Sequence, residues 1–182
     1  ALSATQVDIL CFGDFTGEID LTVTGGTPAT TGYVYDWNTG LSIDEDLTGL
    51  PFGTYNVLVT DSLLCSDSLT VTLTEPAAPI DIEFTILNVA CFGDSTGDVS
   101  AIISGGTGPY TWFWDFPIAD TTLFIDSLPA DGYVLNVLDS NNCTYAETAV
   151  VTEPSGPLTS AYADVQPSCF EYEDGSLTLI AS

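Results

Sequence analysis

The chain has 182 residues, of which 26 are Asp or Glu, and it contains no Lys, Arg or His. Without these side chains there is no Ser-His or Cys-His nucleophile pair, no imidazole zinc ligand and no lysine Schiff base. A formal charge of −26 also repels phosphate backbones and anionic lipid, which excludes nucleic-acid binding and electrostatic membrane binding as functions. An apolar content of 45%, with 3 Trp, 8 Tyr and 9 Phe, is enough to fill hydrophobic cores, so we expect a folded acidic protein.

The sequence repeats itself. The heptapeptides "CFGDFTG" at 11–17 and "CFGDSTG" at 91–97 differ at one position and lie 80 residues apart. Each is followed by an alternating run, a Gly-Gly-Thr turn, an aromatic run, a second cysteine and a proline-rich close, "TEPAAP" or "TEPSGP". This order predicts a first repeat over 1–79, a second over 80–157 and the start of a third over 158–182. We therefore expect the segment to come from a longer tandem array.

Short runs bounded by Gly, Pro, Asp or Ser predict β-strands. The clearest is Glu18–Thr24, in which Ile19, Leu21 and Val23 face one way and acids and threonines face the other. The other expected strands are Gln6–Leu10, Tyr33–Trp37, Leu41–Leu47, Thr54–Thr60, Ser66–Thr74 and, in the second repeat, Asp98–Ile103. The pattern predicts an all-β fold of tandem immunoglobulin-like antiparallel β-sandwich modules, which the proline-rich linkers would join into a rod.

Aromatic residues occupy positions typical of a sandwich core. The stretches "LTGLPFGTY" at 47–55 and "DSLPADGY" at 126–133 place Leu, Pro and Gly ahead of a tyrosine that begins a strand. This is typical of a tyrosine corner, so we interpret Tyr55 and Tyr133 as structural. Trp37, Trp112 and Trp114 are expected in the core by their spacing. The alternative is an exposed aromatic strip on Trp112 and Trp114 that would bind carbohydrate.

Each complete repeat contains two cysteines, Cys11 and Cys65 in the first and Cys91 and Cys143 in the second; Cys169 belongs to the partial copy. A module of about 78 residues buries little surface and commonly needs a covalent staple. Even numbers, the lack of CxxC and the lack of basic residues predict the disulfides Cys11–Cys65 and Cys91–Cys143 in an oxidising compartment, with reduced thiols as the alternative. Such bridges would restrict extension under force to residues outside the bridged loops.

Four aspartates lie near these cysteines, namely Asp14, Asp61, Asp94 and Asp139. With disulfides inside each repeat, Asp14 would approach Asp61, and Asp94 would approach Asp139. Oxygen-only clusters suit Ca²⁺, which an acidic extracellular protein would meet. Their Gly-Asp and Asp-Ser contexts favour a second interpretation, in which the aspartates cap turns. No other cofactor is expected.

The pattern "CFGD(S/F)TG … GGT … Y…W … L…G.Y…V.D….C … TEP" resembles the SprB repeat family, found in tandem in very large surface adhesins of gliding Bacteroidetes bacteria. The resemblance covers both complete repeats and the start of the third, where "CFEYEDGSLTL" departs from "CFGD.TG" but keeps the cysteine. It implies type IX secretion, extracellular display at the cell surface and a role in attachment and gliding. The secretion and gliding machinery would interact with other parts of the full-length protein.

That resemblance also implies a glycosylation pattern. In Bacteroidetes, O-glycosylation follows Asp, then Ser or Thr, then an apolar residue or Thr. The pattern is matched at Ser62, Ser68, Ser95, Thr121 and Ser127.

The function predicted on these grounds is a non-enzymatic structural or adhesive segment of a secreted cell-surface filament. Its partner would be a surface polysaccharide or the substratum, and no direct membrane insertion is expected because no apolar run approaches the length of a membrane span. One alternative is a carbohydrate-binding module of a secreted polysaccharide-targeting protein. The other is a carboxylate-pair glycosidase, against which the acids are spread along strand exteriors and loops.

Overall fold

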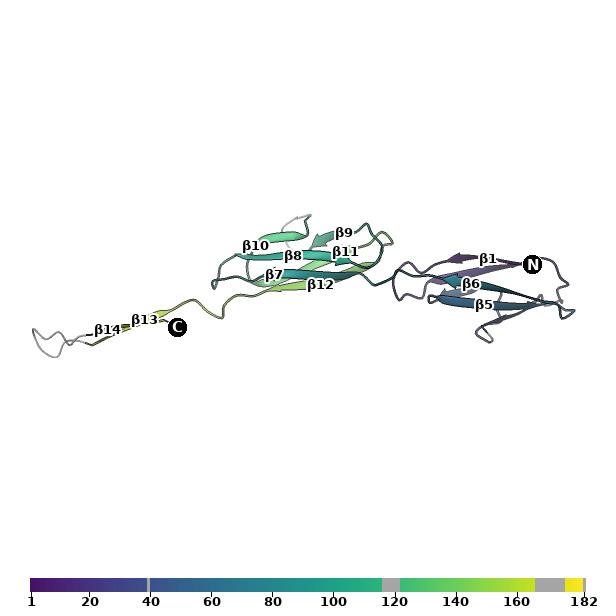
Figure 1. Cartoon of the computed structure of the whole chain (residues 1–182), viewed down its shortest axis with the longest axis horizontal. Coiled ribbons are helices and arrows are strands. Elements are labelled where there is room, and N and C mark those ends of the chain that lie inside the picture. The colour runs from purple at the N-terminus through teal and green to yellow at the C-terminus, as the bar shows by residue number, and fades with distance from the viewer. Residues whose placement is uncertain (39, 116–121, 166–175, 182) are drawn as a thin grey trace, which may run out of the picture. The chain divides into compact units, whose positions relative to one another are not determined.

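The computed structural model describes residues 1–38, 40–115, 122–165 and 176–181 (Figure 1). These residues form 14 strands and no helix. The strands make four three-stranded sheets and one two-stranded hairpin, with antiparallel pairing in each ladder that the register defines. The predicted all-β antiparallel fold is confirmed. Within the described ranges, nothing forms a helix of the length and apolarity needed to cross a membrane.

The first repeat contributes two sheets, with strand orders β1-β2-β4 and β3-β5-β6. This is the strand order of an immunoglobulin constant-type sandwich that lacks its D strand. The strands are β1 Leu2–Val7, β2 Gly17–Val23, β3 Val34–Trp37, β4 Leu47–Leu50, β5 Gly53–Thr60 and β6 Ser66–Leu73.

The second repeat has the same order, β7-β8-β10 in one sheet and β9-β11-β12 in the other. A hairpin of β13 and β14 follows. The strands are β7 Asp81–Leu87, β8 Gly97–Ser104, β9 Thr111–Trp114, β10 Phe124–Leu128, β11 Asp131–Leu138, β12 Thr144–Val151, β13 Ser160–Val165 and β14 Ser176–Ala181.

The chain divides into two compact units whose limits differ from the repeat limits. One unit comprises Ala1–Ile82, Ile103–Trp112 and Val137–Tyr145, and the other comprises Glu83–Ile102, Phe113–Asn136 and Ala146–Ser182. The first repeat therefore lies in one compact unit with the Gly-Gly-Thr turn and the cysteine turn of the second repeat. That association brings together the site described below.

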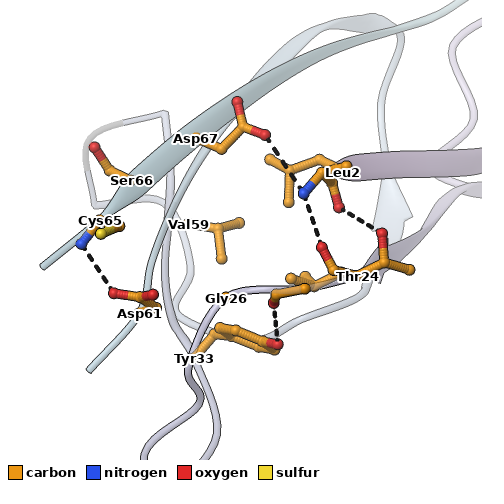
Figure 2. A pocket seen from close by; sticks show the side chains of 12 residues that line it. Leu2, Thr24, Gly26, Tyr33, Val59, Asp61, Cys65, Ser66 and Asp67 are labelled. Atoms are coloured by element: carbon orange, nitrogen blue, oxygen red, sulfur yellow. Dashed lines mark hydrogen bonds and ion pairs between the residues drawn. The ribbon is translucent and has the colours of Figure 1, made fainter. Parts of the chain in front are cut away.

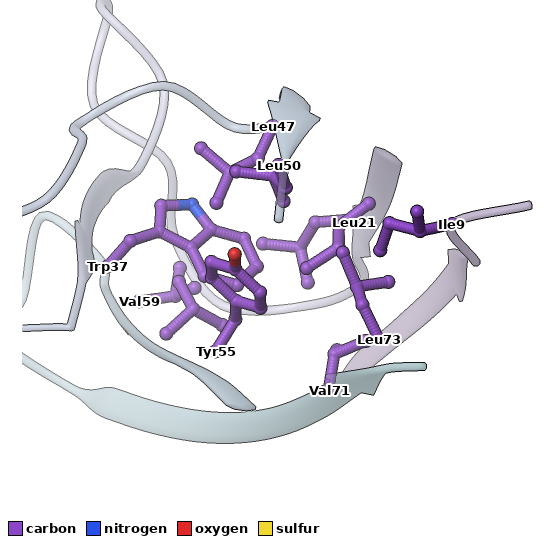
Figure 3. Packing of buried hydrophobic residues seen from close by; sticks show 11 residues of the cluster. Ile9, Leu21, Trp37, Leu47, Leu50, Tyr55, Val59, Val71 and Leu73 are labelled. Atoms are coloured by element: carbon purple, nitrogen blue, oxygen red, sulfur yellow. The ribbon is translucent and has the colours of Figure 1, made fainter. Parts of the chain in front are cut away.

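Alternating side chains build the core of the first sandwich. Along β2, Gly17, Ile19 and Leu21 are buried while the residues between them are exposed, because successive side chains of a strand point to opposite faces. Gly17 lies where the two sheets approach closely, since a Cβ there would stand 2.6 Å from Leu73 Cδ1. The core residues are Ile9, Ile19, Leu21, Trp37, Leu47, Leu50, Tyr55, Val57, Val59, Val71 and Leu73 (Figure 3).

Both tyrosine corners form as predicted. The Tyr55 hydroxyl donates to Pro51 O at 2.8 Å, and the Tyr133 hydroxyl donates to Pro129 O at 2.8 Å. Both tyrosines begin the strand equivalent to F in an immunoglobulin sandwich, β5 and β11. Burial raises the pKa of both hydroxyls, so the stability that they contribute is present below about pH 10 and is lost as the pH rises through the folded-state pKa.

We expect Tyr133→Phe to lower the free energy of unfolding by about 1 kcal/mol, because the ring stays in place while one hydrogen bond to backbone is lost. Urea denaturation at neutral pH measures this. Tyr145→Phe is the control, because Tyr145 is exposed. Equal stabilities for the two variants would show that the corner contributes nothing.

Two predicted strand positions are wrong. The strand expected at Gln6–Leu10 is instead β1, Leu2–Val7. After β1 the chain leaves its sheet, and the Ile9 amide donates to Thr74 O, just beyond the end of β6 in the opposite sheet, at 2.9 Å. The strand expected at Leu41–Leu47 begins only at Leu47. Leu41 and Ile43 are exposed, and the segment instead supplies Asp44 O as the acceptor for Trp37 Nε1. This bond gives the buried indole N–H of Trp37 a hydrogen-bond acceptor.

Candidate functional site

The structure pairs the cysteines differently from the prediction. Cys11 is bonded to Cys143, with a Cα–Cα distance of 5.6 Å, and the bond closes 132 residues. Cys65 and Cys91 are free and exposed. The predicted pairs Cys11–Cys65 and Cys91–Cys143 are therefore wrong, although Cys11 and Cys143 do form a disulfide. Cys169 lies outside the described residues.

The reason is the length of the last strand of each repeat. Cys65 directly precedes β6, whereas the segment after Cys11 lies beyond the other end of β6, where Gly13 N donates to Glu75 Oε2 at 2.7 Å. The 8 residues of β6 span roughly 26 Å at about 3.3 Å per residue. A disulfide needs Cα atoms within about 7 Å, so one repeat cannot bridge its own two cysteines.

The heptapeptide forms a tight turn that presents its cysteine. Gly13 and Gly93 have φ of 78° and 79°, a left-handed conformation that glycine adopts without steric cost. The Asp14 and Asp94 amides each donate to the preceding cysteine carbonyl, Cys11 O or Cys91 O, at 3.1 Å. The carboxylate of the "TEP" close accepts a hydrogen bond from this turn, at Glu75 in the first repeat and at Glu153 in the second. The two motifs thus recur together because they form one structure.

The turn that presents the other cysteine is organised by an aspartate. Asp139 Oδ1 accepts hydrogen bonds from Asn141 N at 2.8 Å and Cys143 N at 2.9 Å, while Oδ2 accepts one from Thr107 N at 2.9 Å. Thr107 belongs to the Gly-Gly-Thr turn, so one carboxylate holds both turns. Only 4% of Asp139 is exposed.

Asp61 makes the same set of bonds in the first repeat. Its Oδ1 accepts from Leu63 N and Cys65 N, both at 2.9 Å, and its Oδ2 accepts from Thr27 N at 3.1 Å. These bonds, that from Cys65 N foremost, lower the pKa of Asp61. The structure therefore uses Asp61 and Asp139 in the way that the turn-capping interpretation describes.

The stability contributed by Asp61 is expected to depend on pH. Because its pKa is lowered from 3.8, the contribution is present above that value and is lost as the pH falls through the folded-state pKa. We expect Asp61→Asn to have a lower free energy of unfolding than wild type at pH 6. The difference between the two proteins, which we call the gap, should be smaller near pH 3. Urea denaturation at both pH values measures the gap. Asp20→Asn, at an exposed position on β2, serves as the control and should show no such convergence.

The aspartates proposed as calcium ligands are distributed differently from the prediction. Asp14 and Asp139 line the same cavity of about 480 Å³, with Cys11 and Cys143, whereas Asp61 lines a different cavity. In the described part of the chain, no group of three or more His, Cys, Asp or Glu side chains is placed to hold a metal ion. Calcium binding at Asp14, Asp61, Asp94 or Asp139 stays a prediction, and a calcium titration of the melting temperature is its test.

The Cys11–Cys143 disulfide belongs to a wider junction. Asn141 Nδ2 donates to Leu10 O at 2.9 Å and to Thr107 Oγ1 at 3.1 Å. The linker contacts the same surface, since Gly106 N donates to Ala78 O at 2.9 Å. A Cβ on Gly105 would lie 1.7 Å from Pro79 O, so this glycine permits the close approach of the linker.

The equivalent end of the first repeat holds a smaller cavity and the free, exposed Cys65. A cavity of about 140 Å³ is lined by Gly25, Gly26, Tyr33, Asp61 and Cys65, together with residues of β1, β2 and β6 (Figure 2). The Tyr33 hydroxyl donates to Gly25 O at 2.7 Å, and Tyr110 donates to Gly105 O in the same way in the second repeat. The two ends therefore share one local structure.

The tryptophans do not form the exposed strip that a carbohydrate-binding surface would need. Trp37 and Trp114 are buried, as the core interpretation predicts, and Trp114 Nε1 donates to Thr122 O at 3.1 Å. Trp112 is half-buried. Burial of Trp114 thus removes one of the two indoles from that surface.

Four predicted glycosylation positions are exposed, Ser62, Ser68, Ser95 and Ser127. The Ser62 hydroxyl donates to Thr27 O at 2.7 Å. Thr121 lies outside the described residues. Modification at these positions stays a prediction, which the intact mass of native material would test.

The fold and this junction define a tandem-repeat β-sandwich protein whose repeats are covalently joined. The SprB repeat family model matches two segments, residues 3–42 and 84–115, which confirms the resemblance over these parts of both complete repeats. Among solved structures, the chain is similar to surface layer protein SbsC, domains 4–9, with a TM-score of 0.32 and 14% identity. The alignment covers 100% of this chain and 36% of that one, so the chain spans about a third of its length. No curated protein matches the chain.

Proposed function

We propose that this chain is a non-enzymatic structural and adhesive segment of a long cell-surface filament that acts in attachment and gliding motility. The observation that carries the proposal is the Cys11–Cys143 bond, which joins two repeats of the SprB type. A bond between modules maintains mechanical continuity along a tandem array. It has no evident use in turnover of a substrate.

The composition supports an exposed, extracellular location. Disulfides persist in oxidising compartments, and the bond closes a loop of 132 residues that a reducing cytosol would open. With no Lys or Arg, the chain offers trypsin-like proteases no cleavage site. The proposal includes secretion by the type IX system and binding to a surface polysaccharide or the substratum. Both parts rest on the SprB resemblance.

One of the carboxylates at the junction cavity is unsuited to glycoside hydrolysis. Asp14, Asp81 and Asp139 all line it, and a carboxylate pair is the minimum for glycoside hydrolysis. Both oxygens of Asp139 accept backbone N–H bonds, however, so this carboxylate is engaged in structure. A general acid must instead be free to exchange a proton with substrate.

Shear flow tests the adhesive role. Beads coated with the oxidised segment should stay on a polysaccharide film at flow rates that remove beads coated with reduced, heat-unfolded segment. The supernatant is assayed for reducing sugar, and none should appear above that from the control beads. Sugar release would overturn the non-enzymatic assignment, and equal detachment of both bead types would overturn adhesion to that polysaccharide.

A further inference from the structure

The described residues include one complete junction and two separate halves of the same kind. Cys91 lies in the second heptapeptide, and Gly93 N donates to Glu153 Oε2 at 2.6 Å, as Gly13 N does to Glu75 beside Cys11. Cys65 lies in the turn before β6, where its amide donates to Asp61. The Cys143 amide donates to Asp139 in the same way in the second repeat. Each free cysteine is therefore presented by the same scaffold as its bonded counterpart.

The residues of the complete junction are more buried than their counterparts around the two free cysteines. Cys11 and Cys143 are half-buried and Asp139 is buried, whereas Cys65 and Cys91 are exposed and Asp61 is only half-buried. Since the hydrogen bonds of the turns are the same, the difference arises from the segment that covers the turn of Cys143. The turn of Cys65 has the same form without that cover.

The Cys65 turn also carries apolar residues that water does not favour. Leu63 and Leu64 are 68% and 84% exposed, where the second repeat has Asn141 and Asn142. Leu64 has φ of 66°, as Asn142 has φ of 65°, a left-handed conformation that Asn tolerates and leucine rarely adopts. A strained and exposed leucine beside a free, exposed cysteine is evidence of a surface that a protein partner covers.

We propose that Cys65 and Cys91 each form a further junction of the Cys11–Cys143 kind, so that every heptapeptide cysteine bonds to the turn cysteine of the next repeat. The partner is another repeat of the same type. For this chain in isolation it is a second copy, with Cys91 of one molecule bonded head to tail to Cys65 of the next. The proposal rests on the scaffolds just described and is independent of any adhesive role.

The bond forms by thiol–disulfide exchange with a small disulfide oxidant such as oxidised glutathione. One cysteine thiolate attacks the oxidant, forms a mixed disulfide and releases the first reduced glutathione. The second cysteine thiolate attacks the protein sulfur of that mixed disulfide and releases the second. Two protein thiols are oxidised, one glutathione disulfide is reduced, and the two thiol protons end on the two glutathione molecules.

The test uses the full chain with Cys169→Ser to remove the cysteine of the partial repeat. One variant adds Cys65→Ser and keeps Cys91, and the other adds Cys91→Ser and keeps Cys65. Both are held in a glutathione redox buffer, separately and mixed. We expect the mixture to form a disulfide-linked dimer at about ten times the yield of either variant alone. Digestion with a protease specific for Asp and Glu, followed by mass spectrometry without reduction, should identify a Cys91–Cys65 peptide.

The contribution of the surface is measured with Leu63→Ser and Leu64→Ser introduced together into the Cys65-bearing variant. We expect dimer formation to slow several-fold, whereas Phe52→Ser, at an exposed position near the tyrosine corner of the first repeat, should leave the rate unchanged. Homodimers as abundant as the mixed dimer, or no dimer while Cys11–Cys143 stays intact, would overturn the proposal. Failure of the bead-adhesion assay would leave this result unaffected.

Discussion

Stretching the oxidised chain between its termini should extend only the residues outside the Cys11–Cys143 loop, and reduction should add about 460 Å of contour length. The loop closes 132 residues, and an extended chain measures roughly 3.5 Å per residue. Force applied at the termini passes through the disulfide, so the strands between the two cysteines carry no extension until the bond is broken. Single-molecule pulling with and without reductant measures the change.

The pulling experiment also discriminates between the two pairings. Bridges within each repeat would hide two separate loops of 54 and 52 residues, about 370 Å in all at the same rise. Cys143→Ser is the control, since it should extend without reductant as the reduced wild type does. Full-length unfolding steps from the oxidised wild type would contradict the Cys11–Cys143 bond.

The same bond should contribute strongly to equilibrium stability. On the chain-entropy model, closing a loop of 132 residues stabilises the folded state by about 5 kcal/mol, because the unfolded chain loses conformational freedom. Reduced protein and Cys143→Ser should therefore unfold at similar, much lower urea concentrations than the oxidised wild type. Monomeric Cys91→Ser should unfold at the same urea concentration as monomeric wild type, since Cys91 forms no disulfide.

Gly105→Ala should disrupt the junction from the linker side. Gly105 has φ of 69°, and a Cβ there would lie 1.7 Å from Pro79 O, so the linker or the turn must move. We expect a loss of about 1 kcal/mol for the left-handed conformation and a further 1–3 kcal/mol for the displaced backbone. Denaturant unfolding of the oxidised protein measures the loss, and the rate of Cys11–Cys143 formation after reduction should fall with it.

The chain supplies a matched control at the equivalent position of the first repeat. Gly25 has φ of 78°, and nothing lies within 4 Å of a Cβ placed there. Gly25→Ala should therefore show only the conformational cost of about 1 kcal/mol and leave disulfide formation unchanged. If both alanine variants lost the same stability, close packing of Pro79 on Gly105 would be excluded as a contribution.

The sequence by itself determined the features that depend on local pattern. The alternation of Ile19 and Leu21 with acids predicts β2, because side chains of a strand alternate between two faces. The Leu-Pro-Gly-Tyr stretches predict the hydroxyl bonds of Tyr55 and Tyr133, whose acceptors lie four residues upstream. The Asp-Ser context of Asp61 likewise favours the turn cap that the structure contains, since the bonds from Leu63 N and Cys65 N are local. The bond from Thr27 N, 34 residues away in the chain, is a tertiary contact that this context does not predict.

Only the tertiary structure decided which cysteines meet. Composition and even spacing suggest that Cys11 pairs with Cys65, but both criteria ignore that β6 separates the two by its full length. The position of β4 was missed for a more local reason, because the segment before it does not form a strand and instead places Asp44 O against Trp37 Nε1. A disulfide forms only where the fold brings two Cα atoms within reach. The compact unit that holds the first repeat together with the cysteine turn of the second repeat does so at Cys11 and Cys143.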